Sequence, residues 1–188
     1  SAFYTDFANE TVYLMPFLSW MYAPNDRWFH QGFLQVEAAA NPSTMTAFGG
    51  GVSEILYTIV PLMRDVGLDA HWHVIFGKEE FFNATKLLHN SLQGAEESLS
   101  DEQWEVFDEI NQINAEGLKG EWDVVIVHDP QPIGLLKGAR AKGKSWIWRC
   151  HIDLSTPNPA PIERLLPMIE EYDASVWHLP TYVPEAMS

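Results

Sequence analysis

From residue 44 onward, short apolar runs rich in β-branched residues alternate with longer amphipathic runs. This alternation predicts the strands of a parallel sheet joined by crossover helices. The short runs are apolar throughout rather than at every second position, which indicates strands covered on both faces. Because crossover connections are right-handed, the expected fold class is α/β, with a doubly wound parallel sheet.

The expected order of elements is β-α-β-α-α-β-α-β-α-β. A capping box of Ser100 and Gln103 opens one of the helices. The first strand has two possible positions: Pro42, just before the glycines, is a poor occupant of a central strand, and residues 33–37 (FLQVE) are the alternative. The later strands are expected at 70–76, 123–127, 145–150 and 174–179, and the helices at 52–66, 79–92, 101–116, after Pro132, and at 160–172.

Length and charge restrict the class of protein. A chain of 188 residues suits one domain, here expected at 44–188, preceded by an unmatched aromatic-rich segment at 1–43. The formal net charge of −15 argues against nucleic acid or an anionic membrane as partner. Cys150 is the one cysteine, so we expect no internal disulfide and a cytoplasmic location. No apolar run approaches the roughly 20 residues of a transmembrane helix.

Polar and unusual residues recur where strands are expected to end. They lie at 46–51, 77–78, 128–132 and 151–156. The carboxyl ends of parallel strands converge on one crevice, where open α/β sheets bind ligands. The sequence therefore predicts one ligand site built from these four segments.

Three adjacent glycines, Gly49, Gly50 and Gly51, precede the helix expected at 52–66. Free amides at a helix N-terminus bind phosphate or another anion, and missing side chains let a ligand touch the backbone. A tight turn without any ligand explains the glycines equally well. The dinucleotide pattern GxGxxG is not met, because Glu54 stands where its third glycine would be.

Two further segments carry candidate site residues. His128, Asp129 and Gln131 lie on a proline-stiffened loop that suits hydrogen bonding to hydroxyl groups, although a structural turn is the alternative. Arg149, His151 and Asp153 follow at every second position, which would place them on one face. A salt-bridge network is the alternative there, because unpaired burial of ionisable groups is costly.

His71 and His73 have the spacing of metal ligands. With no third ligand nearby in the sequence, we interpret them as two outward-facing strand histidines and expect neither a metal nor a cofactor.

Four motifs together resemble one known family: TAFGGGVSEIL, EEFFNATKLLHNSLQG, VVIVHDPQP and WIWRCHIDLSTPN. They are similar to the N-terminal half of trehalose synthase of the glycosyl-transferring type, a retaining glycosyltransferase with two Rossmann-like domains (the GT-B fold). The likeness covers about 140 residues in register. It implies transfer of glucose from a nucleoside diphosphate glucose to glucose, giving trehalose.

The resemblance also implies roles for the candidate residues. The loop of Gly49, Gly50 and Gly51 would lie against the donor diphosphate. The acceptor sugar pocket would be lined by His128, Asp129 and Gln131. Among the candidate catalytic residues, His151 would face the transferred sugar, with Arg149 and Asp153 in support.

Two departures from the family pattern bear on whether this chain is a complete catalyst. Residues 1–43 match nothing in it, and the chain ends at Ser188, near the hinge where such enzymes enter their donor-binding domain. We therefore expect an acceptor-side domain that is incomplete as a catalyst by itself. The alternative is a non-catalytic binding or structural subunit of a larger assembly, with residues 1–43 meeting a protein partner. A nicotinamide-dependent oxidoreductase is disfavoured by the absent glycine pattern.

Overall fold

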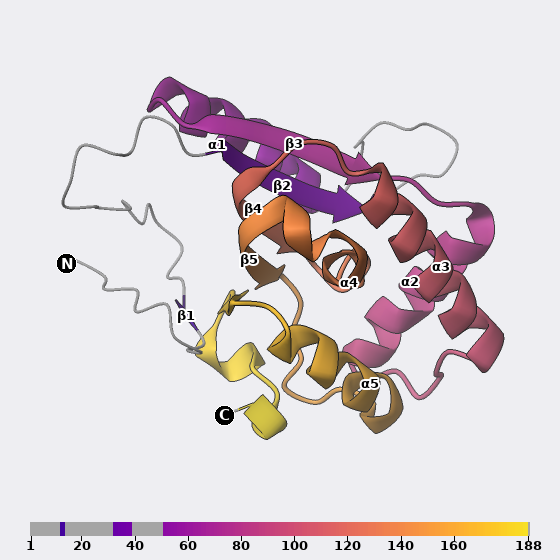
Figure 1. Cartoon of the computed structure of the whole chain (residues 1–188). Helices are drawn as coiled ribbons and strands as arrows, with labels where there is room; N and C mark the ends of the chain where they lie inside the picture. Colours follow the sequence, from indigo (N-terminus) through magenta and orange to yellow (C-terminus); the bar gives the residue numbers. More distant parts are fainter. Residues whose placement is uncertain (1–11, 14–31, 39–50, 188) are drawn as a thin grey trace.

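The computed structural model describes residues 12–13, 32–38 and 51–187, and its side chains are described from residue 51. A six-stranded sheet has the order β1-β6-β5-β4-β2-β3, and all its neighbouring strands are parallel (Figure 1). Its strands are β1 (Val12–Tyr13), β2 (Gly32–Ala38), β3 (Asp69–Ile75), β4 (Trp122–His128), β5 (Gly143–Cys150) and β6 (Ala174–Trp177). The α-helices are α1 (Gly51–Asp65), α2 (Glu79–Leu92), α3 (Asp101–Gly117), α4 (Leu135–Ala139) and α5 (Pro159–Glu170). Short 3₁₀ turns cover Arg140–Lys142, Pro180–Tyr182 and Glu185–Met187.

The order from β2 to β6 confirms the predicted sequence of strands and helices. The alternative first strand at 33–37 is also confirmed, because β2 covers it and pairs with both β3 and β4. β1 was not predicted: it adds an edge strand beside β6. Two strands of the sheet therefore come from the segment 1–43.

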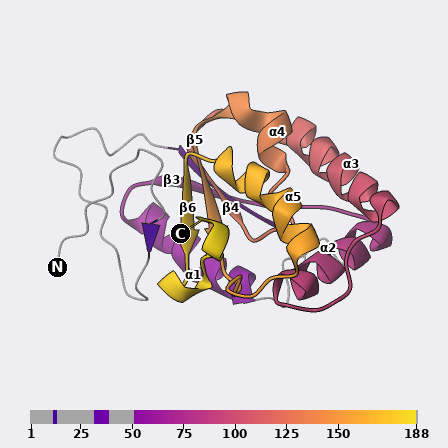
Figure 2. The ribbon, with the colours of Figure 1, turned by 90° about the horizontal axis from the view of Figure 1, so that it is seen from below.

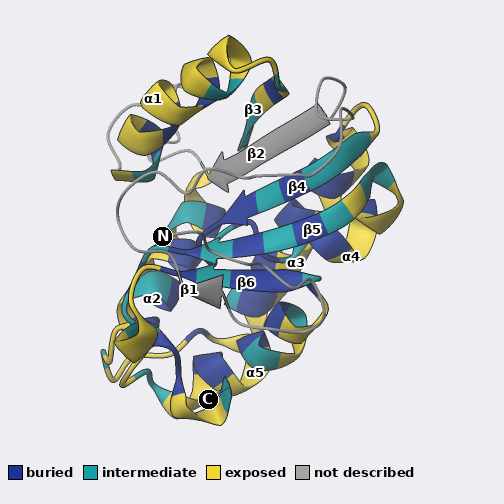
Figure 3. Ribbon diagram, turned by 90° about the vertical axis from the view of Figure 1, so that its left-hand side faces the viewer, coloured by how far each residue is buried: buried dark blue, intermediate teal, exposed yellow. Residues whose placement is uncertain are grey.

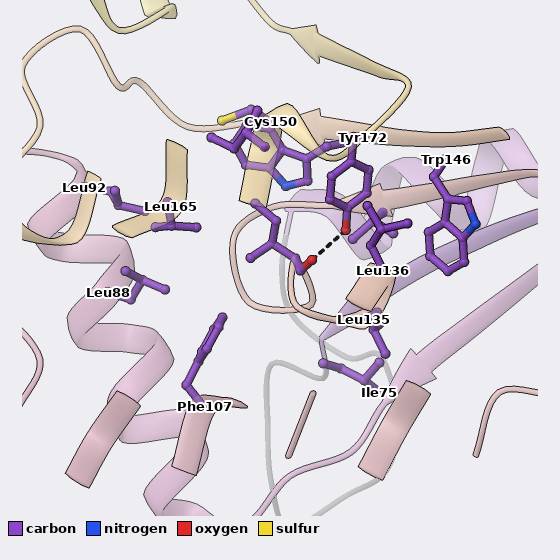
Figure 4. Close-up of a cluster of buried hydrophobic side chains, with 14 of the residues drawn as sticks. Ile75, Leu88, Leu92, Phe107, Leu135, Leu136, Trp146, Cys150, Leu165 and Tyr172 are labelled. Atoms are coloured by element: carbon purple, nitrogen blue, oxygen red, sulfur yellow. Dashed lines mark hydrogen bonds between the residues drawn. The ribbon is translucent and has the colours of Figure 1, made fainter. Parts of the chain in front are cut away.

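One face of the sheet carries the large core, against which α2, α3, α4 and α5 pack (Figure 2). Alternate residues of the central strands point into it, including Val125 and Val127 of β4 and Trp146 and Trp148 of β5. Figure 4 shows part of this core, where the buried Tyr172 hydroxyl donates a 2.7 Å hydrogen bond to the carbonyl of Ile133. The polar end of the tyrosine is thereby satisfied inside an apolar cluster.

The opposite face is covered, among the described helices, by α1 alone. Leu56 and Val60 of α1 pack on Ala70 of β3, and these three form a small separate core. The amphipathic pattern predicts an apolar face along this helix, yet Ile55 and Ile59 are exposed, and much of α1 is coloured as exposed in Figure 3. α1 lies over the β3 edge of the sheet, and among the described residues Leu56 and Val60 are its buried apolar contacts with β3.

Local sequence signals account for where several helices begin and end. The Ser100 hydroxyl accepts from the Gln103 amide and the Gln103 side chain accepts from the Ser100 amide, which is the predicted capping box. Gly67 and Gly94 take positive φ angles of 91° and 95° just after α1 and α2, a conformation that favours glycine. Among the described helices, none combines the length and apolar character that crossing a bilayer requires.

Candidate functional site

The two predicted histidines meet at the carboxyl edge of the sheet. His128 is the last residue of β4, and His151 follows the last residue of the neighbouring strand β5. His128 Nδ1 lies 2.8 Å from His151 Nε2, and the ring planes are 16° apart with centroids 5.1 Å apart. Because imidazole N–H groups and lone pairs lie in the ring plane, this near-coplanar arrangement gives an aligned N–H···N hydrogen bond.

Asp129, the residue after β4, has a left-handed backbone conformation with a φ of 65°. Its backbone N–H donates to the Arg149 carbonyl at 2.8 Å, and its carbonyl accepts from Trp148 Nε1 at 2.9 Å. Its carboxylate Oδ1 accepts from the His151 backbone N–H at 2.8 Å. A non-glycine residue with this φ is uncommon and costs free energy, and such strain clusters at functional sites.

Two buried asparagines of α3 anchor the loops around this site, and the sequence analysis did not identify them. Asn111 Nδ2 donates to the Gln131 carbonyl at 3.1 Å. Asn114 exchanges two hydrogen bonds with the backbone of Phe76, at 2.8 and 3.0 Å, just beyond the end of β3. Polar residues at core-facing helical positions, next to Phe107 and Ile110, were the signal that could have revealed them.

Both histidines are neutral at neutral pH. Burial lowers the pKa of His128 well below its usual value, and the neighbouring His151 and Arg149 lower it further. Burial and then the positive charge of Arg149 lower the pKa of His151 to about 3. A neutral imidazole has one donor and one acceptor nitrogen, so two neutral rings satisfy each other through one N–H···N bond.

The same surroundings act on the two charged groups. Burial raises the pKa of Asp129 to about 6, although the His151 amide and Arg149 oppose the change. Arg149 Nη1 is buried and has no hydrogen-bond partner among the described residues. A buried donor without a partner costs about 1–3 kcal/mol. The site therefore combines a carboxylate acceptor with a buried cationic donor that has no partner within residues 51–187.

The other candidate residues lie in different surroundings. The side chain of Asp153 accepts from the Ser155 amide at 2.8 Å, and β5 ends at Cys150, so strand alternation does not extend to Asp153. Gln131 is half-buried on the loop after β4. Gly51 is the first residue of α1, and no described atom lies within 4 Å of where its Cβ would be. Gly49 and Gly50 lie outside the described residues.

His71 and His73 lie on β3, well away from this cluster. His71 Nε2 is 2.9 Å from an Asp69 carboxylate oxygen and is exposed. The two histidines line a hollow of about 310 Å³ with Trp122, at the amino end of β4. Within residues 51–187 no three His, Cys, Asp or Glu side chains are grouped so as to hold a metal ion.

Comparison with known proteins identifies relatives over most of the chain. The family described as "Trehalose synthase, N-terminal domain" matches residues 43–184. Trehalose synthase of Rubrobacter xylanophilus is 50% identical over 144 residues, which is 74% of this chain and 35% of that protein. Trehalose synthase of Thermococcus litoralis is 50% identical over 145 residues, covering 76% and 35%. The chain thus spans about a third of the length of the curated relatives it matches.

Among solved structures, one described as "OtsA apo structure" aligns with a TM-score of 0.45 at 15% identity, over 74% of this chain and 37% of the other. On its sequence relationship, the chain belongs to the trehalose synthase family, of which it carries the N-terminal domain.

Proposed function

We propose that this chain is the acceptor-side domain of a retaining glycosyltransferase that moves glucose from a nucleoside diphosphate glucose to free glucose and forms trehalose. One observation carries the proposal: the tips of β4 and β5 bring His128, Asp129 and His151 into one hydrogen-bonded cluster. The relatives named trehalose synthase supply the reaction class.

The chemistry of the cluster suits a sugar. Sugar hydroxyls both donate and accept hydrogen bonds, so a site that mixes carboxylate, neutral imidazole and guanidinium groups can satisfy them. Asp129 offers acceptor oxygens and Arg149 offers a buried donor that has no partner within the described residues. The strained loop is fixed by Trp148 and Asn111, so little ordering entropy remains to be lost when a ligand binds.

In the proposed reaction, negative charge develops on the departing diphosphate while the sugar ring becomes cation-like. Backbone amides at the start of α1 would stabilise the diphosphate, and carboxylate and imidazole groups would stabilise the ring. Gly49, Gly50 and Gly51 are the residues proposed for the diphosphate, and Gln131 and Asp153 complete the sugar side. The nucleotide would be held by a second domain, as the family resemblance implies, so this chain alone is expected to bind sugar without turnover.

Titration calorimetry with glucose and with trehalose tests the proposal. We expect weak binding, with a dissociation constant in the millimolar range, that is lost in His151→Ala. His71→Ala is the matched control, because this histidine lies at the far end of the sheet, and it should bind like the wild type. Sugar binding that survives His151→Ala, or efficient trehalose formation by the 188-residue chain alone, would contradict the proposal.

A further inference from the structure

His128 and His151 stand in different surroundings although their rings are joined. Only 6% of His128 is exposed, whereas His151 is half-buried and reaches the edge of the sheet. Of the two rings, His151 therefore has the larger surface to offer a sugar. The ring of His128 is hydrogen-bonded to the more exposed His151.

The hydrogen bond occupies a particular atom of His151. Nε2 of His151 meets Nδ1 of His128 at 2.8 Å, and the backbone N–H of His151 donates to Asp129. Of the hydrogen bonds found between described residues, these two hold His151, and neither uses its Nδ1. Among the described residues, Nδ1 is therefore the ring nitrogen of His151 left for a ligand.

We propose that His128 is a positioning residue: by holding Nε2 of His151 it fixes the orientation and tautomer of that ring and directs Nδ1 toward the sugar. In a neutral imidazole the partner of one nitrogen decides which nitrogen carries the proton. The sugar-directed half of this inference rests on the proposed function, whereas the coupling of the two rings does not.

Nuclear magnetic resonance of the protein labelled with ¹⁵N-histidine tests the coupling without any sugar. In the wild type we expect a ¹⁵N–¹⁵N scalar coupling across the hydrogen bond and a single tautomer for His151, whose signals are assigned through His151→Gln. Absence of the coupling, together with two averaged tautomers for His151, would overturn the proposal.

Two variants separate positioning from simple packing. His128→Leu removes the ring nitrogen, so His151 should lose its single tautomer. His128→Asn places a polar atom two bonds beyond Cβ, where Nδ1 stands in histidine, and should restore the single tautomer. An unchanged His151 spectrum in His128→Leu would contradict the proposal. If His128→Leu does not fold, the spectrum of His128→Asn tests the proposal by itself. Two averaged tautomers of His151 in His128→Asn would contradict the positioning role of His128.

Glucose affinity completes the test. Loss of one neutral hydrogen bond corresponds to roughly a tenfold weaker dissociation constant. We expect this loss in His128→Leu, near wild-type affinity in His128→Asn, and no added loss when His128→Leu is introduced into His151→Ala. An added loss there would mean that His128 touches the sugar itself. If the wild type binds no glucose, the proposed function fails while the ring coupling still decides the role of His128.

Discussion

The two faces of the sheet differ in how much apolar surface they bury. On one face, α2, α3, α4 and α5 enclose a continuous core that includes Trp146, Trp148 and Phe107. On the other, the buried residues that the structure describes under α1 are Leu56, Val60 and Ala70. Truncating a buried side chain should therefore lower the free energy of unfolding by different amounts on the two faces. The loss is smaller where fewer atoms surround the side chain, because the neighbours can move into the cavity more easily.

The candidate site is held in place by residues on the face with the large core. Trp148 donates to the Asp129 carbonyl from within the large core, and Asn111 of α3 holds the Gln131 carbonyl from the same side. Rigid elements position functional groups better than loops do. The strained loop after β4 therefore takes its rigidity from the large core.

The largest difference between the faces should appear in a matched pair of leucines. Leu88 of α2 and Leu56 of α1 are both 0% exposed. Leu→Ala substitutions in buried sites cost about 2.7–5 kcal/mol, according to the cavity that remains. We expect Leu88→Ala near the upper end and Leu56→Ala near the lower end, measured by urea unfolding. Equal losses of unfolding free energy would break the comparison.

A second prediction concerns the polar group that the large core buries at the site. The pKa of Asp129 is about 6 in the folded protein against an ordinary 3.8. The folded state therefore binds its proton more tightly, so this residue makes stability fall as pH rises from about 3.8 to about 6. Above that window the penalty is at most about 3 kcal/mol.

Asp129→Asn removes this penalty while keeping a residue type that tolerates positive φ. We expect the variant to be more stable than the wild type at pH 7 and nearly equal to it at pH 4. Thermal unfolding at the two pH values checks this. The same difference at both pH values would show that Asp129 is not held as described.

A smaller loss of unfolding free energy is expected when the lysine that caps α3 is replaced. α3 packs in the large core. Lys142 Nζ donates to the carbonyls of Ala115, Glu116 and Leu118 at the carboxyl end of this helix. Charge-assisted bonds of this kind contribute about 1.5–3 kcal/mol, so Lys142→Met should destabilise by roughly 2 kcal/mol.

Lys144→Met is the control for that substitution. Lys144 is largely exposed and pairs with Asp123 at the surface. Screening by water and salt makes such a pair worth little. Denaturant midpoints should separate the two variants clearly, and a Lys144→Met loss as large as that of Lys142→Met would contradict the capping role.

The smallest effect is expected on the outer row of α1. Ile59 is 40% exposed; it precedes the buried Val60 and lies one turn after the buried Leu56. Ile59→Gln should change stability by less than about 0.5 kcal/mol. Circular dichroism melting is sufficient to measure this. A loss above about 1 kcal/mol would show that this side of the helix is covered in solution, and the contrast between the faces would then be smaller than described.

Periodicity and strand ends in the sequence predicted much of this architecture. They placed the five helices and the strands from β3 onward, because apolar spacing, capping residues and glycines are local signals. They also predicted that the tips of β4 and β5 share an edge. β1 was missed, because a two-residue strand has no period.

The details of the site depended on tertiary contacts that no spacing encodes. Asn111 and Asn114 bind the backbone of segments distant in the chain. The bond between His128 and His151 joins residues 23 positions apart. Strand alternation also does not reach Asp153, because β5 ends three residues earlier, and the Asp153 side chain accepts from the Ser155 amide.

The central claim, that sugar binds at the carboxyl edge of β4 and β5, is tested most directly by two tryptophan indole signals in one glucose titration. Trp148 Nε1 donates to Asp129 beneath the site, while Trp122 Nε1 donates to the Lys119 carbonyl at the opposite end of the sheet. We expect the Trp148 indole resonance to shift and saturate with glucose while the Trp122 resonance stays constant. A Trp148 signal that does not move at saturating glucose, or a shift confined to Trp122, would contradict it.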